Sequence, residues 1–210
     1  GSEMCIRDRH TKVHKYIKLG VFGGSFDPPH KAHLELVKLV VEKLELDHVL
    51  VTVANNPWQK SAVRQVTDSS HRLEMARLLF SGYSDATVTD IEFQLGSESI
   101  TSETLRALRS NYHDAEFYLL LGYDTAIAIE TWRNPDLVLD QSRVVVVERP
   151  GFTDMELPSI LSSAIRIKGL NLDISSENIR SLLKDEETIA DVIPQGLSLI
   201  HISEPTRRSM

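Results

Sequence analysis

The chain has 210 residues, of which 41% are hydrophobic and 25% charged, and its formal net charge is −7. These values suit a one-domain soluble globular protein, and the acidic balance disfavours a nucleic-acid-binding protein, which would carry a basic face. No apolar run reaches the roughly 18 residues of a membrane span, and the first residues given do not show the charged-then-apolar pattern of a secretory leader. The one cysteine, Cys5, cannot form an intramolecular disulfide. We therefore expect a cytoplasmic protein that binds neither nucleic acid nor membrane, and we leave open whether it is a homo-oligomer.

The two ends of the chain do not resemble parts of a fold. One coding sequence for residues 4–9 is ATG TGT ATA AGA GAC AG, and its reverse complement encodes residues 197–202. Two tails encoded by opposite strands of one short DNA resemble a sequencing adaptor that was translated with the gene. We therefore expect residues 1–9 and 197–210 to be non-native tails and residues 10–196 to form one domain.

In the first half of this domain, strand patterns alternate with helical ones. Residues 16–22 predict a strand that ends at two glycines. Residues 31–46 predict a helix with apolar positions at helical spacing, and residues 49–54 a buried strand. A second helix is expected over residues 70–80, and a strand over residues 87–93.

The second half continues the alternation. We expect a helix over residues 102–112, strands over 116–121 and 143–148, and a short helix over 175–184. This last helix starts with serine, a common N-cap residue. The segment 151–170 has the least regular pattern, which predicts a loop.

The strands predicted here are apolar along their whole length and alternate with helices. Such strands are typical of a parallel sheet that is covered on both faces. The fold class we expect is therefore α/β, a single domain with a doubly wound parallel sheet. Ligands of such folds bind beyond the carboxyl ends of the strands, where the first turn and its helix begin.

The segment GVFGGSFDPPHKAHLE, residues 20–35, covers the passage from the first strand to the first helix. Gly23 and Gly24 allow backbone N–H groups to approach a ligand closely, and the helix after the prolines offers free N–H groups to an anion. His30 and His33 would share one helical face. These features suit a phosphate site, although the glycines and prolines could equally serve only to punctuate the chain. A zinc site is disfavoured because no third ligand lies nearby.

The sequence GGSFDPPHKAH resembles the signature G-x-F-D-P-x-H-x-G-H of the nucleotidylyltransferase superfamily. The segment ISSENIR, residues 174–180, resembles its second motif, I-S-S-T-x-I-R. Between them, NPWQK, GYD, TWR and RPG follow the order seen in bacterial nicotinate-nucleotide adenylyltransferases, and NPWQK is most similar to actinobacterial members. The resemblance covers residues 10–196 and implies the Rossmann-like nucleotidylyltransferase fold.

The resemblance implies an enzyme of NAD biosynthesis that transfers AMP from ATP to nicotinate mononucleotide and releases pyrophosphate. The nucleophile is a phosphate oxygen that is already ionised at neutral pH, so alignment and charge neutralisation take the place of a general base. Mg²⁺ is expected to accompany ATP and bridge its phosphate oxygens. No residue is assigned as a protein ligand of a metal.

The resemblance also implies which residues form the site. The catalytic residues would be His30, His33 and Arg180. ATP would contact Gly23, Gly24, Ser25, Phe26, Lys60, Gly122, Asp124, Ile174, Ser175 and Ser176. The mononucleotide would contact Asn56, Thr101, Trp132 and Arg149, with the Trp132 indole stacked on the pyridine ring.

Several of these residues also have plainer interpretations. Lys60 could be a solvated charge, Asp124 and the two serines helix caps, and Trp132 a core residue. Arg180 could form a surface ion pair with Asp173 or Glu177, and we expect the pair with Glu177 in the ligand-free protein.

Three residues depart from the family pattern. Ala32 replaces the glycine between the histidines, Ile100 replaces a tyrosine of the segment S-Y-T-x-D-T-L, and Glu177 replaces the threonine of the second motif. These departures favour one alternative, a non-catalytic nucleotide-binding relative. A second alternative, an adenylyltransferase that uses nicotinamide mononucleotide, stays open because the sequence does not distinguish the acid from the amide. A sibling transferase that acts on pantetheine phosphate is disfavoured by Trp132 and by His30, where that family has threonine.

Overall fold

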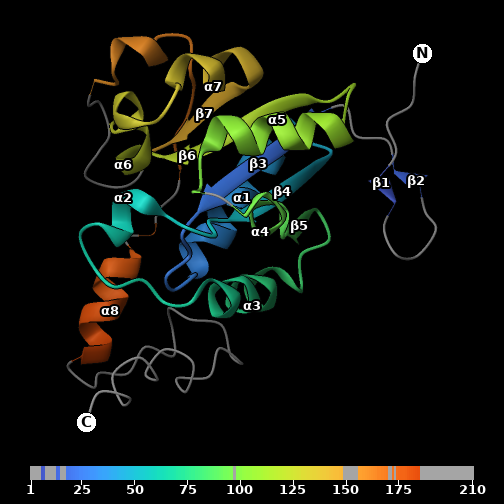
Figure 1. Ribbon diagram of the computed structural model, residues 1–210. Coiled ribbons are helices and arrows are strands. Elements are labelled where there is room, and N and C mark those ends of the chain that lie inside the picture. The colour runs from blue at the N-terminus through green and yellow to red at the C-terminus, as the bar shows by residue number, and fades with distance from the viewer. Residues whose placement is uncertain are drawn as a thin grey trace.

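A computed structural model describes residues 18–96, 98–148, 156–169, 172 and 174–184, with the short pieces 6–7 and 13–14. Its main feature is a six-stranded sheet in the order β5-β4-β3-β6-β7-β8, in which every ladder is parallel (Figure 1). The strands are β3 (Lys18–Gly24), β4 (His48–Val53), β5 (Ala86–Thr89), β6 (Glu116–Gly122), β7 (Arg143–Val147) and β8 (Ile165–Ile167). A separate antiparallel ladder joins β1 (Ile6–Arg7) to β2 (Val13–His14).

Helices cover both faces of the sheet. The longer ones are α1 (Lys31–Leu44), α3 (Ser69–Phe80), α5 (Thr101–Asn111), α7 (Pro135–Gln141) and α8 (Ser176–Lys184). The short ones are α2 (Trp58–Ser61), α4 (Ile91–Leu95), α6 (Tyr123–Ala126), η1 (Ile129–Thr131) and η2 (Ser159–Leu161). Helices α1 and α3 contribute to one apolar core, and α5, α6 and α7 to the core on the opposite face.

Strand β4 shows why the strand patterns were apolar throughout. All of its residues are buried, because successive side chains point to opposite faces and each face is covered. Val49 and Val51 belong to the core beneath α1 and α3, whereas Leu50 belongs to the core beneath α5. The doubly wound parallel sheet predicted from the sequence is therefore confirmed.

The order of the strands fixes where a ligand can bind. From β3 the chain adds β4 and β5 on one side, and later adds β6, β7 and β8 on the other. The order reverses between β3 and β6, and in open α/β sheets the ligand crevice lies at the carboxyl ends of the strands at such a point. Here those ends are Gly24 and Gly122.

Two predicted segments differ in the structure. The strand expected over residues 87–93 ends at Thr89, and α4 begins two residues later because the Asp90 carbonyl accepts hydrogen bonds from two N–H groups of the helix. The loop expected over residues 151–170 contains η2 and β8 in its described part. Strand β8 has only three residues at the edge of the sheet, too few to produce a periodic pattern.

Gly20 provides a test of packing in the sheet. A Cβ atom at this position would lie 2.8 Å from Cγ2 of Val49 and 3.0 Å from Cδ1 of Leu46. We expect Gly20→Ala to lower the free energy of unfolding by about 1–3 kcal/mol, because a tightly packed core resists an added methyl group. Urea unfolding would measure this change in the free energy of unfolding. Gly82→Ala is the control, since a Cβ there meets no atom within 4 Å; an equal loss in both variants would contradict the packing explanation.

Candidate active site

A cavity of about 700 Å³ lies at the carboxyl ends of the central strands. Gly23 and Gly24 at the end of β3, Gly122 at the end of β6 and the first turn of α8 contribute to its wall. Its volume is in the range of small-molecule sites, about 300–1,000 Å³. The cavity therefore occupies the place that the strand order predicts for a ligand.

Most of the residues predicted from the sequence meet in this cavity. All of them line it except Asn56 and Arg149. The exposed Asn56 lies nearby, where its N–H donates to Oγ of Ser99 (3.1 Å). Arg149 lies outside the described residues. The assignment of individual side chains to ATP or to the mononucleotide stays a prediction.

The turn after β3 is shaped by the side chain of Phe26. This residue has a positive φ of 48° and is almost fully buried, with its ring against Phe22 and His33 at centroid distances of 5.6 and 4.9 Å. A Cβ on Gly24 would lie 3.1 Å from the Phe26 ring. Gly24 therefore makes room for an aromatic side chain, in addition to the close approach of a ligand that the sequence suggested.

The two histidines are arranged differently from the prediction. His30 is the extended N-cap residue of α1 and not a member of the helix. Its N–H donates to Nδ1 of His33 (3.1 Å), and the two rings stack with centroids 3.7 Å apart. Because Nδ1 of His33 accepts this bond, the proton of the neutral imidazole lies on Nε2, where it can be donated to a phosphate oxygen.

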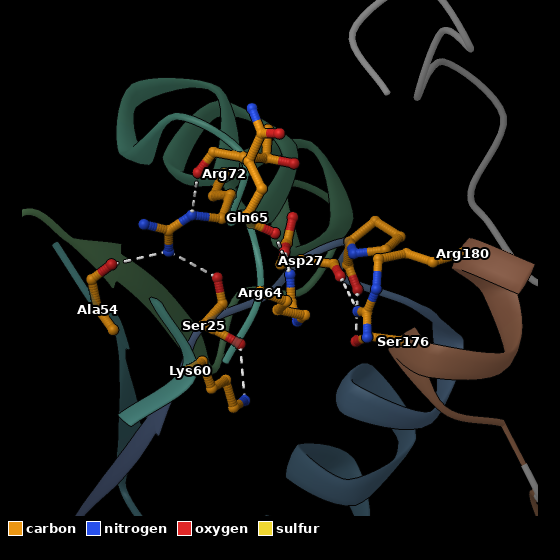
Figure 2. Close-up of polar contacts among 11 residues, drawn as sticks. Ser25, Asp27, Ala54, Lys60, Arg64, Gln65, Arg72, Ser176 and Arg180 are labelled. Atoms are coloured by element: carbon orange, nitrogen blue, oxygen red, sulfur yellow. Dashed lines mark hydrogen bonds and ion pairs between the residues drawn. The ribbon is translucent and has the colours of Figure 1, made fainter. Parts of the chain in front are cut away.

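The guanidinium of Arg72 ties the loops of the site together. Arg72 is 1% exposed and donates to the carbonyl oxygens of Ser25 and Ala54 (both 2.7 Å) (Figure 2). It also donates to the carbonyl oxygens of Thr67 (2.8 Å) and Asn55 (3.2 Å). These carbonyls follow β3 and β4 and precede α3. One buried side chain therefore sets the relative positions of three segments around the cavity.

Three further cations reach the same turn from the side of the cavity. Nζ of Lys60 donates to Oγ of Ser25 (2.8 Å). Nη1 of Arg64 donates to Oδ2 of Asp27 (2.5 Å), and Nη1 of Arg180 donates to the carbonyl oxygen of Asp27 (2.5 Å) (Figure 2). All three side chains line the cavity, so this part of its wall is rich in positive charge.

The first turn of α8 is joined to the same region. Oγ of Ser176 donates to the Pro28 carbonyl (2.9 Å), and Oγ of Ser175 accepts from the Asn178 N–H (3.1 Å) as an N-cap. The capping interpretation of Ser175 is thus confirmed, and it is compatible with a role toward a ligand, since both serines also line the cavity. Asp124 lies in the first turn of α6, whose N-cap is Gly122.

The predicted ion pair between Glu177 and Arg180 is wrong. The Arg180 guanidinium is engaged with the Asp27 carbonyl, and no ion pair between Glu177 and Arg180 occurs among the described residues. Glu177 is exposed and lines the cavity, where its charge acts on Arg180 through space. Its carboxylate therefore remains at the cavity wall.

The charges of this region influence one another strongly. Burial alone would raise the pKa of Asp27, but hydrogen bonds from Thr67 and Arg64 and the charge of Arg180 hold it below its usual value. Desolvation and the charges of Arg64 and Arg180 lower the pKa of Lys60, although the side chain as a whole is exposed. The Asp27 carboxyl is therefore ionised at neutral pH, and it is outnumbered by the cations around it.

A further part of the cavity wall is built from two segments in contact. The Gln59 amide donates to the carbonyl and to Oγ1 of Thr131 (both 3.2 Å), and the Arg133 guanidinium lies 4.7 Å from the Trp58 ring centroid. Trp132 is partly buried against the core and also lines the cavity. Packing against the core is therefore observed for Trp132, and stacking of its indole on a pyridine ring stays a prediction.

Several cavity residues were not predicted from the sequence: Trp58, Gln59, Arg64, Glu92 and Arg133. Glu92 is buried, its Oε1 accepts from the Thr104 hydroxyl (2.9 Å), and burial raises its pKa. Arg64 lies in a polar loop where no local pattern distinguishes it from a solvated charge. Glu92 lies in the segment that was expected to be a strand.

The described residues meet neither the requirements of a metal site nor those of a membrane-spanning helix. Among them, no group of three or more His, Cys, Asp or Glu side chains could hold a metal ion. No described helix combines the length and the apolar character that a membrane crossing requires.

Comparisons with known proteins agree with this geometry. The family model described as cytidylyltransferase-like matches residues 21–182. Among solved structures, the chain is similar to the nicotinic acid mononucleotide adenylyltransferase of Plasmodium falciparum in complex with NaAD. That similarity has a TM-score of 0.73, with 22% identity over 89% of this chain and 94% of the other. At this identity the match supports the fold.

Two curated proteins named probable nicotinate-nucleotide adenylyltransferase are more similar in sequence. The one from Gemmatimonas aurantiaca is 33% identical over 87% of this chain and 88% of its own length. The one from Geobacillus thermodenitrificans is 34% identical over 87% of this chain and 82% of its own length. The chain therefore belongs to the cytidylyltransferase-like family and, within it, to the nicotinate-nucleotide adenylyltransferases.

Proposed function

We propose that this chain transfers AMP from ATP to nicotinate mononucleotide, producing nicotinate adenine dinucleotide and pyrophosphate. One observation carries the proposal: the first motif, Lys60, Trp132 and the start of α8 line a single cavity to which Lys60 and Arg180 contribute positive charge. A nucleotide triphosphate suits the cations, and an aromatic base suits the indole.

The reaction needs little covalent chemistry from the protein. A phosphate oxygen of the mononucleotide attacks the α-phosphorus of ATP, a P–O bond forms there, and the bond to the β-phosphate bridging oxygen breaks, so that pyrophosphate leaves. His33 donates from Nε2 to an oxygen of the α-phosphate as negative charge builds up, and His30 stacks on it and holds it in place. Arg180 and Ser176 hold the leaving phosphates.

Magnesium would enter with ATP and would neutralise charge on its phosphate oxygens. The protein contributes no metal cluster of its own among the described residues, so its own work is to hold the two substrates in line and to complement the charge that develops. The cytoplasmic location remains a prediction from the sequence, and the oligomeric state remains open.

The decisive experiment is the release of pyrophosphate from ATP, measured with nicotinate mononucleotide and, in parallel, with nicotinamide mononucleotide. We expect turnover with the acid to exceed that with the amide. Faster turnover with the amide would show that nicotinamide mononucleotide, not the acid, is the acceptor substrate. Binding of ATP without turnover on either acceptor would identify a non-catalytic nucleotide-binding relative.

His33→Ala tests the proposed donor to the α-phosphate. We expect a loss of about 3 kcal/mol of transition-state stabilisation, roughly a hundredfold or more in rate, with little change in ATP binding. Steady-state kinetics and calorimetry would separate the two effects. An unchanged rate would exclude His33 from the mechanism.

The control for this variant addresses the second role of His33. Its Nδ1 accepts the His30 N–H at the start of α1, so alanine also removes a helix cap worth about 1 kcal/mol of stability. His33→Gln retains an acceptor at this position of the helix. The His33→Gln variant should regain most of the stability that alanine loses, but none of the lost catalytic rate.

Glu177→Thr tests the acidic residue at the cavity wall. A carboxylate in the first turn favours the isolated helix by about 0.3–1 kcal/mol but repels a triphosphate that approaches the same turn. We therefore expect the variant to bind Mg²⁺-ATP more tightly and to be slightly less stable without ligand. Titration at two salt concentrations should show the difference shrinking at high salt.

Glu103→Thr is the matched control for this charge change. Glu103 also lies in the first turn of a helix, α5, but it does not line the cavity. Its variant should leave ATP affinity unchanged. Weaker ATP binding by Glu177→Thr would instead mean that Glu177 assists the nucleotide, for example by holding its magnesium ion.

A further inference from the structure

Arg64 is a cation of the cavity that the sequence motifs do not include. It lies in the loop between α2 and α3, and its side chain is 28% exposed. Nη1 donates to Oδ2 of Asp27 (2.5 Å) and to the Gln65 carbonyl (2.8 Å). Because the side chain also lines the cavity, its guanidinium is both anchored and accessible to a ligand.

The partner of Arg64 places it beside Arg180. The two guanidinium groups bind the same residue, Arg64 the carboxylate of Asp27 and Arg180 its carbonyl oxygen (Figure 2). Arg180 approaches from α8 and Arg64 from the loop after α2, so they reach Asp27 from two separate segments. A ligand group held by one guanidinium is therefore within reach of the other.

The turn around Asp27 gathers cations. The Asp27 carboxylate is 3% exposed and forms an ion pair with Arg64, and Lys60, Arg72 and Arg180 bind oxygen atoms of the same turn. Glu177 acts on Arg180, and Asp68 and Glu92 act on Arg72, only through space, so direct ion pairing offsets these cations only in part. Arginine is the side chain best suited to hold phosphate oxygens, because its planar fork can donate two parallel hydrogen bonds.

We propose that Arg64 is a phosphate-binding residue that holds the β- and γ-phosphates of ATP together with Arg180, and so binds the pyrophosphate that leaves. This inference rests on the proposed function and adds a residue to it. In the ligand-free protein Asp27 holds the guanidinium in position, which spares the ligand part of the entropic cost of ordering a long side chain.

The experiment measures binding of inorganic pyrophosphate with magnesium by calorimetry, in the wild type and in Arg64→Gln. We expect the variant to bind pyrophosphate about tenfold more weakly, since one charge-assisted contact is lost. The affinity for nicotinate mononucleotide, which we expect to bind beside Trp132, should fall less than twofold. Arg106→Gln is the control, because Arg106 is an exposed arginine paired with Glu103 on α5 and does not line the cavity; it should leave both affinities unchanged.

A second pair of variants separates binding from anchoring. If Arg64 only anchored Asp27, then Asp27→Asn would weaken pyrophosphate binding as much as Arg64→Gln, and the double variant would be no worse. We expect instead that Asp27→Asn binds pyrophosphate at least as tightly as the wild type. Adding Arg64→Gln to this variant should then weaken pyrophosphate binding about tenfold. Arg64→Lys, which keeps the charge but not the fork, should be intermediate and carries the test if the glutamine variant does not fold.

The outcomes distinguish this inference from the proposed function. Wild-type affinity for pyrophosphate in Arg64→Gln, or no binding of pyrophosphate by the wild type, would overturn the role of Arg64 even if the enzyme turns over normally. Loss of pyrophosphate affinity in Arg64→Gln, in a wild-type protein that releases no pyrophosphate from ATP, would support this role and overturn the proposed reaction.

Discussion

The active-site end of this protein depends on the hydrogen bonds of one buried guanidinium. Arg72 donates to four carbonyl oxygens that belong to the segments after β3, after β4 and before α3. Carbonyl groups in loops lack the partners that a helix or strand provides, and leaving them buried without a donor is costly. Because Arg72 satisfies several of them at once, the loops can turn sharply around the cavity and still be held in one arrangement.

The same turn explains how an acidic chain can offer a site to a polyanion. Asp27 collects cations from three different segments, and its carboxylate offsets part of their mutual repulsion in the ligand-free state. A site that contained only the cations would destabilise the folded protein, whereas a site with too many carboxylates would repel the nucleotide. A buried acid placed among these cations is a compromise between folding and binding, and the exposed Glu177 adds a second carboxylate to the same cavity wall.

The sequence predicted the sheet and most of the cavity because both have local signals. The continuously apolar pattern of residues 49–54 arises from burial on two faces, and the glycines and histidines of the first motif lie close together in one short segment of the chain. Arg72 and Arg64 carried no such signal. The partners of Arg72 lie 5, 17, 18 and 47 residues away, and Asp27 lies 37 residues from Arg64. Helix α4 was missed for a related reason, since a single turn of helix is too short to establish a period.

The position of α8 has a consequence for shortened versions of this gene. The last strand of the sheet ends at Ile167, so the whole sheet precedes the helix that supplies Ser176 and Arg180. A frameshift or a misassembled reading frame that stops before α8 would preserve every strand and both apolar cores of the sheet while deleting one wall of the nucleotide site. Such a product would pass a test for secondary structure and fail as an enzyme, so the integrity of the carboxyl-terminal part is the feature to verify first when related genes are recovered from fragmentary DNA.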